Sequence, residues 1–346
     1  MKTISTLALA IIAAATVRAD ITLTPSYTVR APVGHEYALS LIFDPEMPQT
    51  YGYGTSGVVL ITTTEAWALH DSMVLSRIFD PNFAGVRMFE ESLAYYDRTS
   101  QTYTFSGGLL DARIYNFSMQ TMSLTAQGAL MDLIDIPAGF AIRGTTGELF
   151  AASRPFGGND YYQIPPRDSA LYRYSPVTGD TYGTIFGNTG PGAVSNEVGA
   201  VLFGPDGRLN VLDVGRQEIL RYDPDTLEFL DAISLVSTTT DKTSFAISST
   251  GYIFTTNTDT TSGGIYDYLT GDYVGTFEGM AEGREPGRGG KLAMTADDAG
   301  NVYVTNSMVS AYLSVFSTST IPEPSTIALF IGGSVAAFVA LRRRRK

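Results

Sequence analysis

The stretch FAISSTGYIFTTNTDTTSGGIYDYLTGDYVGTF, residues 245–277, decides the fold of this chain. Four short runs in it, at 245–247, 252–255, 265–268 and 273–277, are rich in aromatic and β-branched residues, which favour extended strands. The turn between the first two runs ends in Gly251, and glycine supplies the positive φ that a tight hairpin requires. The stretch therefore predicts a four-stranded antiparallel meander.

The same unit recurs at three other places, so the chain is built from repeats. Glycines equivalent to Gly251 end the first turn at Gly147, Gly207 and Gly300, and the successive intervals are 60, 44 and 49 residues. A blade of a β-propeller takes roughly 40 to 50 residues. The body, residues 20–320, therefore has room for about six or seven blades. Residues 20–53 show no repeat partner, and we expect them to supply the strand that closes the ring with the last, incomplete blade.

The repeat is less regular before residue 140. Residues 104–117 resemble one further unit, and residues 57–61 together with 88–97 resemble another. The long first interval between turn glycines contains an insertion at 154–168. Insertions in repeat folds tend to fall on the binding face. We therefore expect a ligand loop there, formed by Arg154, Phe156, Asp160, Tyr161 and Tyr162. Two other long glycine-rich connections, 187–197 and 279–291, are expected on the same face.

The body resembles six- or seven-bladed propellers of the NHL and YVTN type. The resemblance covers about two thirds of the chain and implies an all-β fold of four-stranded blades. The chain has one tryptophan and no Trp-Asp repeat, which disfavours the WD40 type. A pair of β-sandwiches and a parallel β-helix remain the alternatives, although a β-helix has a shorter period.

The N-terminus is typical of a secretory signal peptide. Lys2 precedes an apolar run at 7–17, and the small residues Val17 and Ala19 stand at positions −3 and −1 of a cleavage site before Asp20. The run is too short to span a bilayer. Residues 1–19 are thus predicted to direct export through the Sec machinery.

The C-terminus combines three parts in a fixed order. The motif Pro322-Glu323-Pro324 comes first, an uncharged stretch at 327–341 follows, and five basic residues close the chain. Such a basic end stays in the cytoplasm, which predicts a transmembrane helix with the body outside. Residues 321–346 resemble the PEP-CTERM sorting signal. The resemblance implies that an exosortase recognises Pro322, Glu323 and Pro324 and removes the tail. A plain stop-transfer anchor is the alternative.

Composition excludes several classes of function. The net charge of −12 disfavours nucleic acid as a partner, because phosphates require Lys and Arg. The absence of cysteine excludes disulfides and thiolate chemistry. His35 is expected to be a loop residue. His70 is followed directly by Asp71 and Ser72, and three consecutive residues do not make a catalytic triad.

The acidic pairs at 223–225 and 297–298 are expected in hairpin turns, where Asp caps its own backbone. Calcium binding at either pair stays open, but we expect no metal site and no cofactor. These features together predict an exported, non-catalytic surface or biofilm-matrix protein that contacts extracellular polysaccharide or has a purely structural role. A propeller-fold enzyme, such as a polysaccharide lyase or a lactone-type hydrolase, is the alternative.

Overall fold

The structure is a computed structural model of the whole chain. It describes residues 21–30, 38–43, 55–62, 66–70, 75–79, 94–97, 102–106, 114–118, 123–127, 137–143, 146, 148–153, 170–174, 181–186, 191–194, 198–235, 242–257, 262–279, 292–306, 312–319 and 321. Side chains are described mainly in the blades that follow residue 137.

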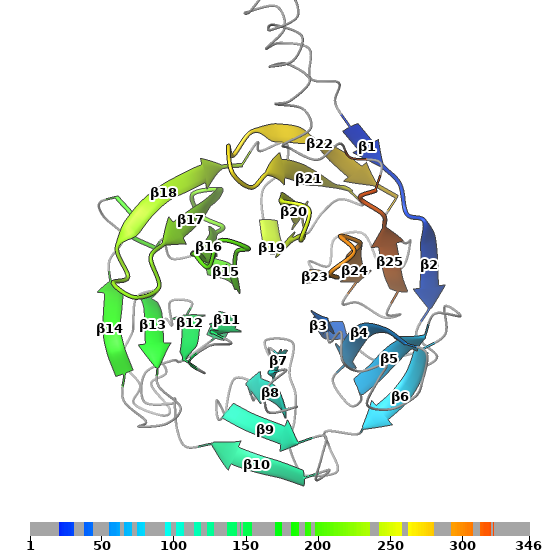
Figure 1. Cartoon of the computed structure of the whole chain (residues 1–346), viewed down its shortest axis with the longest axis horizontal. Coiled ribbons are helices and arrows are strands. Elements are labelled where there is room, and N and C mark those ends of the chain that lie inside the picture. The colour runs from blue at the N-terminus through cyan, green and yellow to red at the C-terminus, as the bar shows by residue number, and fades with distance from the viewer. Residues whose placement is uncertain are drawn as a thin grey trace, which may run out of the picture.

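The described strands form six sheets arranged around a ring, as Figure 1 shows. Each of the first four sheets in the sequence is a four-stranded meander from the ring axis outward. They are β3 (Ala38–Phe43), β4 (Thr55–Thr62), β5 (Ala66–His70), β6 (Leu75–Phe79); β7 (Ala94–Asp97), β8 (Thr102–Ser106), β9 (Ile114–Ser118), β10 (Ser123–Gln127); β11 (Pro137–Ile142), β12 (Leu149–Ser153), β13 (Ala170–Tyr174), β14 (Thr181–Phe186); and β15 (Val198–Phe203), β16 (Leu209–Asp213), β17 (Glu218–Tyr222), β18 (Phe229–Ser234).

The last two sheets each include one strand from the N-terminal segment. The fifth contains β19 (Lys242–Ile247), β20 (Tyr252–Asn257), β21 (Ser262–Asp267) and β22 (Tyr273–Glu278), with β1 (Ile21–Leu23) added in parallel to β22. The sixth contains β23 (Leu292–Ala296), β24 (Val302–Asn306) and β25 (Tyr312–Phe316), and β2 (Tyr27–Arg30) pairs antiparallel with β25. The expectation that residues 20–53 close the ring is confirmed.

Local sequence explains why each meander turns where it does. Gly207, Gly251 and Gly300 have φ of 79°, 85° and 84°, in the left-handed region that side chains disfavour. All three stand one or two positions before the first residue of the second strand of a blade. The all-β propeller class predicted from the repeat is therefore confirmed.

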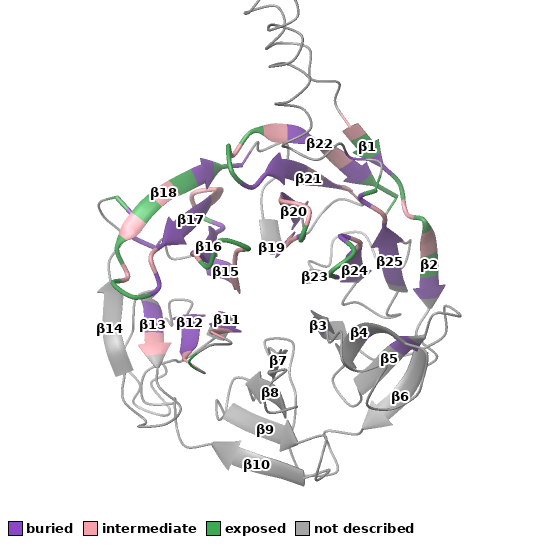
Figure 2. Ribbon diagram, in the orientation of Figure 1, coloured by how far each residue is buried: buried purple, intermediate pink, exposed green. Residues whose placement is uncertain are grey.

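Apolar side chains fill the space between neighbouring blades. Figure 2 shows buried residues concentrated on the middle strands and exposed residues on the outer β18. One cluster joins Leu23 and Phe254 to Phe277, Val302 and Phe316, which come from β1 and from two blades. The largest fully buried side chains are all aromatic and belong to such clusters: Tyr222, Tyr252, Tyr266, Tyr268, Phe150, Phe245, Phe254, Phe277 and Phe316.

One repeat unit predicted from the sequence, residues 57–61 together with 88–97, is wrong. Residues 94–97 form β7 and pair with β8, so they do not belong with residues 57–61 in β4. The first strand of the β4 sheet is β3, from the segment that had no repeat partner. The predicted signal peptide and, apart from Ile321, the predicted sorting tail at 321–346 lie outside the described residues. Among the residues that the structure describes, no helix is long and apolar enough to cross a membrane.

Candidate functional site

The meander gives the ring two different faces. In each blade, the connection from the first to the second strand and that from the third to the fourth emerge on one side, because successive strands are antiparallel. Those that are fully described are short turns, such as 204–208 and 223–228. We call this side the turn face. The other strand ends, including those that flank the predicted loops 154–168, 187–197 and 279–291, lie on the opposite side, which we call the loop face.

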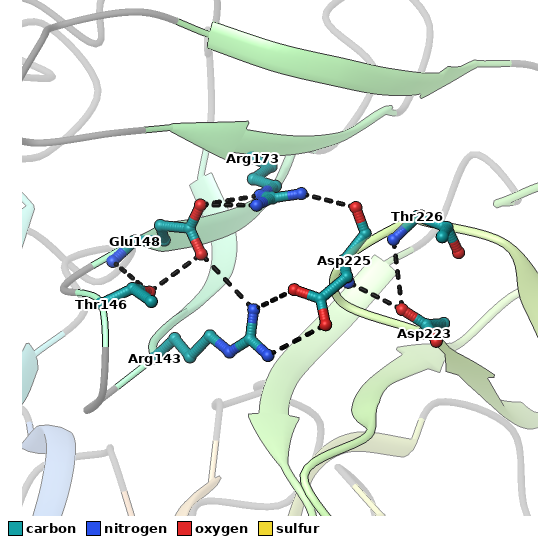
Figure 3. A network of polar contacts seen from close by, with 7 residues as sticks. All are labelled: Arg143, Thr146, Glu148, Arg173, Asp223, Asp225 and Thr226. Carbon is teal, nitrogen blue, oxygen red and sulfur yellow. Dashed lines mark hydrogen bonds and ion pairs between the residues drawn. The ribbon is translucent and has the colours of Figure 1, made fainter.

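A polar network on the turn face joins the β11–β14 blade to the β15–β18 blade (Figure 3). Arg173 on β13 donates from Nε and Nη2 to Glu148 Oε1, at 3.0 and 2.6 Å, and from Nη1 to the carbonyl of Asp225, at 2.7 Å. Arg143 donates to both carboxylate oxygens of Asp225, at 2.5 and 3.2 Å. Two arginines of one blade therefore hold the outer turn of the next.

Electrostatics keep the acids of this network ionised. Burial raises the pKa of Glu148, but the hydrogen bonds from Arg173 and Thr146 and the nearby guanidinium charges together hold that pKa below its ordinary value. The hydrogen bond from Arg143 lowers the pKa of Asp225, and the charge of Arg143 acts in the same direction. Acids with depressed pKa values are poor proton donors at neutral pH. The network suits structure better than proton transfer.

The same device recurs between the next two blades. Arg221 on β17 pairs with Asp231 and donates to the carbonyl of Tyr268, at 2.7 Å, and the hydroxyl of Tyr268 donates to Asp206 Oδ1, at 2.5 Å. Tyr268 lies in the turn after β21 and so belongs to the following blade. Gly204 leaves room for the tyrosine, because a Cβ at this position would stand 2.0 Å from its hydroxyl oxygen. Side-chain hydrogen bonds and ion pairs on the turn face therefore join each of these blades to the next.

The acidic pairs on the turn face also act as structural caps. Asp223 Oδ1 accepts from the backbone N–H of Asp225 and of Thr226, at 2.7 and 3.1 Å. Asp297 Oδ1 accepts from the Asn301 N–H at 2.7 Å, and its Oδ2 accepts from the Tyr303 hydroxyl at 2.9 Å. The predicted capping role is confirmed, but Asp297 is buried rather than solvated.

The loop face presents a different acid. Asp213 is the last residue of β16, and its side chain is completely buried beside the start of the inner strand β15, where it pairs with Val198. Its Oδ1 accepts from the Arg216 N–H at 2.9 Å, and its Oδ2 lies 3.8 Å from Arg216 Nε. Asp213 is thus a carboxylate held in one orientation at the inner end of the loop face.

Strand register places further polar residues at the position of Asp213. Asn257 ends β20 opposite Lys242, and Asn306 ends β24 opposite Leu292, just as Asp213 ends β16 opposite Val198. Ser153 ends β12 in the same way. Four successive blades therefore bring a polar residue to the inner end of the loop face.

Sequence reasoning did not single out this set, although a signal was present. Aligned on their turn glycines, the units of β16, β20 and β24 show a column of Asp213, Asn257 and Asn306 six residues after the glycine. Three groups of residues that were singled out lie outside the described residues. They are the predicted ligand loop (Arg154, Phe156, Asp160, Tyr161 and Tyr162), the sorting motif (Pro322, Glu323 and Pro324) and His35. His70 ends β5, on the turn face. Within the described ranges no group of three His, Cys, Asp or Glu residues is arranged to hold a metal ion.

Comparison with known proteins identifies relatives by fold only. No protein-family model and no curated protein sequence matches the chain. A solved structure assigned as a gluconolactonase superposes with a TM-score of 0.58 over 85% of this chain and 93% of its own, at 13% identity. A streptogramin B lyase superposes with a TM-score of 0.52 over 84% of this chain and 97% of its own, at 10% identity. At these identities the likeness establishes the β-propeller fold.

The prediction that the body is not an enzyme is contradicted by this comparison, because both neighbours are named for a catalytic activity. That prediction rested on the scarcity of histidine and of local catalytic motifs. A carboxylate brought to the ring axis by the end of a strand leaves no such motif in the sequence.

Proposed function

We propose that this chain is an exported propeller-fold enzyme that hydrolyses a lactone at the inner end of its loop face. The observation that carries the proposal is the register of Asp213, Asn257 and Asn306, which stand at equivalent strand ends in three successive blades. The assigned activity of the gluconolactonase neighbour supports it.

The chemistry assigned to these residues is general base catalysis. The Asp213 carboxylate takes a proton from water, and the resulting hydroxide attacks the lactone carbonyl. Asn257 and Asn306, which stand at the equivalent strand ends, are assigned to the oxyanion of the tetrahedral intermediate, because amide donors stabilise the charge that develops there. The ring C–O bond then breaks, and the proton passes from Asp213 to the alkoxide that leaves. The product is one open-chain hydroxy acid.

The test is a pH-stat assay of the purified protein against γ- and δ-lactones of sugars, which release acid when they open. Asp213→Asn is expected to lower kcat/KM by about 100-fold or more. The amide still accepts the hydrogen bond from the Arg216 N–H, so the turn is preserved. Asp298→Asn is the matched control, because this exposed acid lies on the turn face. Equal activity of the two variants would contradict the assignment of Asp213.

A lyase is the second candidate, because the streptogramin B lyase superposes over nearly all of its own length. Elimination breaks the alkyl C–O bond of the lactone, so it also releases a carboxylic acid, but it produces a new carbon–carbon double bond and adds no water. Ultraviolet absorbance of an unsaturated product that has not gained the mass of one water would favour the lyase over the hydrolase.

The place of action is part of the same proposal. Residues 1–19 direct export, an exosortase removes the tail that carries the Pro322-Glu323-Pro324 motif, and the body reaches the cell surface or a polysaccharide matrix. The Pro322-Glu323-Pro324 motif and the basic end of the chain support this route. Mass spectrometry of the surface protein is expected to show loss of Lys346, and an intact C-terminus would refute the sorting step.

A further inference from the structure

The last described residues of the body are packed into the ring. Ile321 is 5% exposed and belongs to the core cluster that contains Leu23 of β1, Phe277 of β22 and Phe316 of β25. An isoleucine at this depth is part of the hydrophobic core rather than of a linker. The chain therefore does not leave the fold at the end of β25.

Polar contacts hold the same segment in place. The Thr318 hydroxyl donates to the carbonyl of Gly300 at 2.6 Å, and Thr318 is 2% exposed. The Ile321 N–H donates to the carbonyl of Thr318 at 2.8 Å, which folds residues 318–321 into a turn. Between these two anchors Ser319 is exposed. We call Thr318 and Ile321 the terminal anchor.

The N-terminal strand lies against this anchor. A Cβ on Gly275 would stand 2.0 Å from the carbonyl oxygen of Ile21, so the backbone of β1 lies directly on β22. Leu23 then reaches the same cluster as Ile321. The two ends of the body are thus fastened to each other as well as to the blades, and opening one end exposes apolar surface of the other.

We propose that the terminal anchor is a proteolytic stop, so that proteolysis from the C-terminus ends on the C-terminal side of Ile321 while the ring is folded. A protease needs several residues in an extended, accessible conformation, whereas Thr318 and Ile321 are buried and are joined to each other by a backbone hydrogen bond. Hydrolysis of a peptide bond beyond Ile321, with water supplying the hydroxyl of the new carboxylate and a hydrogen of the new amine, leaves the core intact. Applied to sorting, this inference rests on the proposed removal of the tail, and it then requires that the mature body keeps Ile321.

The test uses the full chain, extracted in mild detergent and digested under native conditions with proteinase K, followed by intact mass measurement. The resistant core of the wild type is expected to end at Ile321 or later. Ile321→Asp places a charge in the cluster and is expected to move the end of the core to residue 317 or earlier. Thr318→Val keeps the shape and removes the hydrogen bond to Gly300. It is expected to speed the loss of Ile321 about fivefold, which is the effect of one hydrogen bond on a local opening equilibrium.

Ser319→Asp is the matched control, because it adds the same charge at an exposed position between the anchors. It is expected to leave the boundary unchanged. A wild-type core that lacks Ile321, or the same boundary and rate in all three variants as in the wild type, would overturn the proposal. The added protease replaces any sorting enzyme, so the result does not depend on whether the chain is sorted or hydrolyses lactones.

Discussion

Replacing Arg173 by methionine removes the central cation of the network that fastens the β11–β14 blade to the next. Arg173 makes three hydrogen bonds, two to Glu148 and one to the carbonyl of Asp225, and its guanidinium lies 5.9 Å from the centre of the Phe150 ring. The side chains of Arg173 and Glu148 are 18% and 13% exposed. Methionine retains most of the apolar length of arginine but leaves the largely buried Glu148 without this partner.

The expected magnitude lies between two limits. An exposed ion pair contributes about 0.2–1 kcal/mol, and breaking a buried pair costs about 3–5 kcal/mol. The partial exposure of this pair therefore gives an expected loss of about 2 kcal/mol in the free energy of unfolding. Arg208→Met is the matched control, because Arg208 and its partners Asp206 and Asp231 are 40%, 31% and 43% exposed. Its expected cost is about 0.5 kcal/mol.

The assay is urea unfolding followed by circular dichroism, with comparison of midpoints at a common slope. Acid supplies an independent check. The pKa of Glu148 is lowered in the fold from the ordinary 4.5, so its contribution to stability is present above pH 4.5 and is lost as the pH falls through the folded value. The difference between wild type and Arg173→Met should therefore shrink below pH 4.5. A cost no larger than that of Arg208→Met, or one that is the same at pH 3 and pH 7, would refute the reasoning.

Two further predictions concern the fastening of the turn face around Tyr268. Gly204→Ala is expected to cost about 1–3 kcal/mol, because the new methyl group would overlap the Tyr268 hydroxyl. Gly207→Ala should cost only about 1 kcal/mol through its positive φ, because the position is otherwise open, and equal denaturation midpoints for the two variants would contradict the steric argument. Burial and the hydrogen bond to Asp206 raise the pKa of Tyr268 to about 12, so its contribution to stability is complete below pH 10 and declines as the pH rises to 12. The phenolate absorbance of Tyr268 is the difference between the wild type and Tyr268→Phe, and it should appear near pH 12 in the native protein. Asp206→Asn should lower the pH at which it appears. Titration near pH 10 would show that the tyrosine is accessible to water.

The sequence predicted the strands of the regular blades because their determinants are local. Gly251 and its equivalents mark the first hairpin of each unit, and the runs beside them alternate with turns over short distances. Prediction failed where long connections interrupt the period. The segments 44–54 and 80–93 separate strands of unequal spacing, and residues 94–97 were consequently assigned to the wrong unit.

The candidate site and the interblade contacts were harder to predict for another reason. Arg143 and Asp225 are 82 residues apart, so nothing in the local sequence relates them. Asp213 was passed over because a single aspartate at the end of a strand has no motif of its own. Its significance appears only when the register of β16 is compared with that of β20 and β24.

The closure of the ring by β1 and β2 sets the order in which the molecule can be completed. These strands come first in the chain, but their partners β22 and β25 come last. Their pairing joins residues almost 300 positions apart, and contacts of such high sequence separation slow folding because the loop entropy is lost before the contact forms. The intermediate blades can form as local meanders while the edges of the N-terminal strands remain unpaired. A chain of this design therefore passes through a stage in which its two ends can pair with another copy, and this risk lasts until residue 316 has been synthesised.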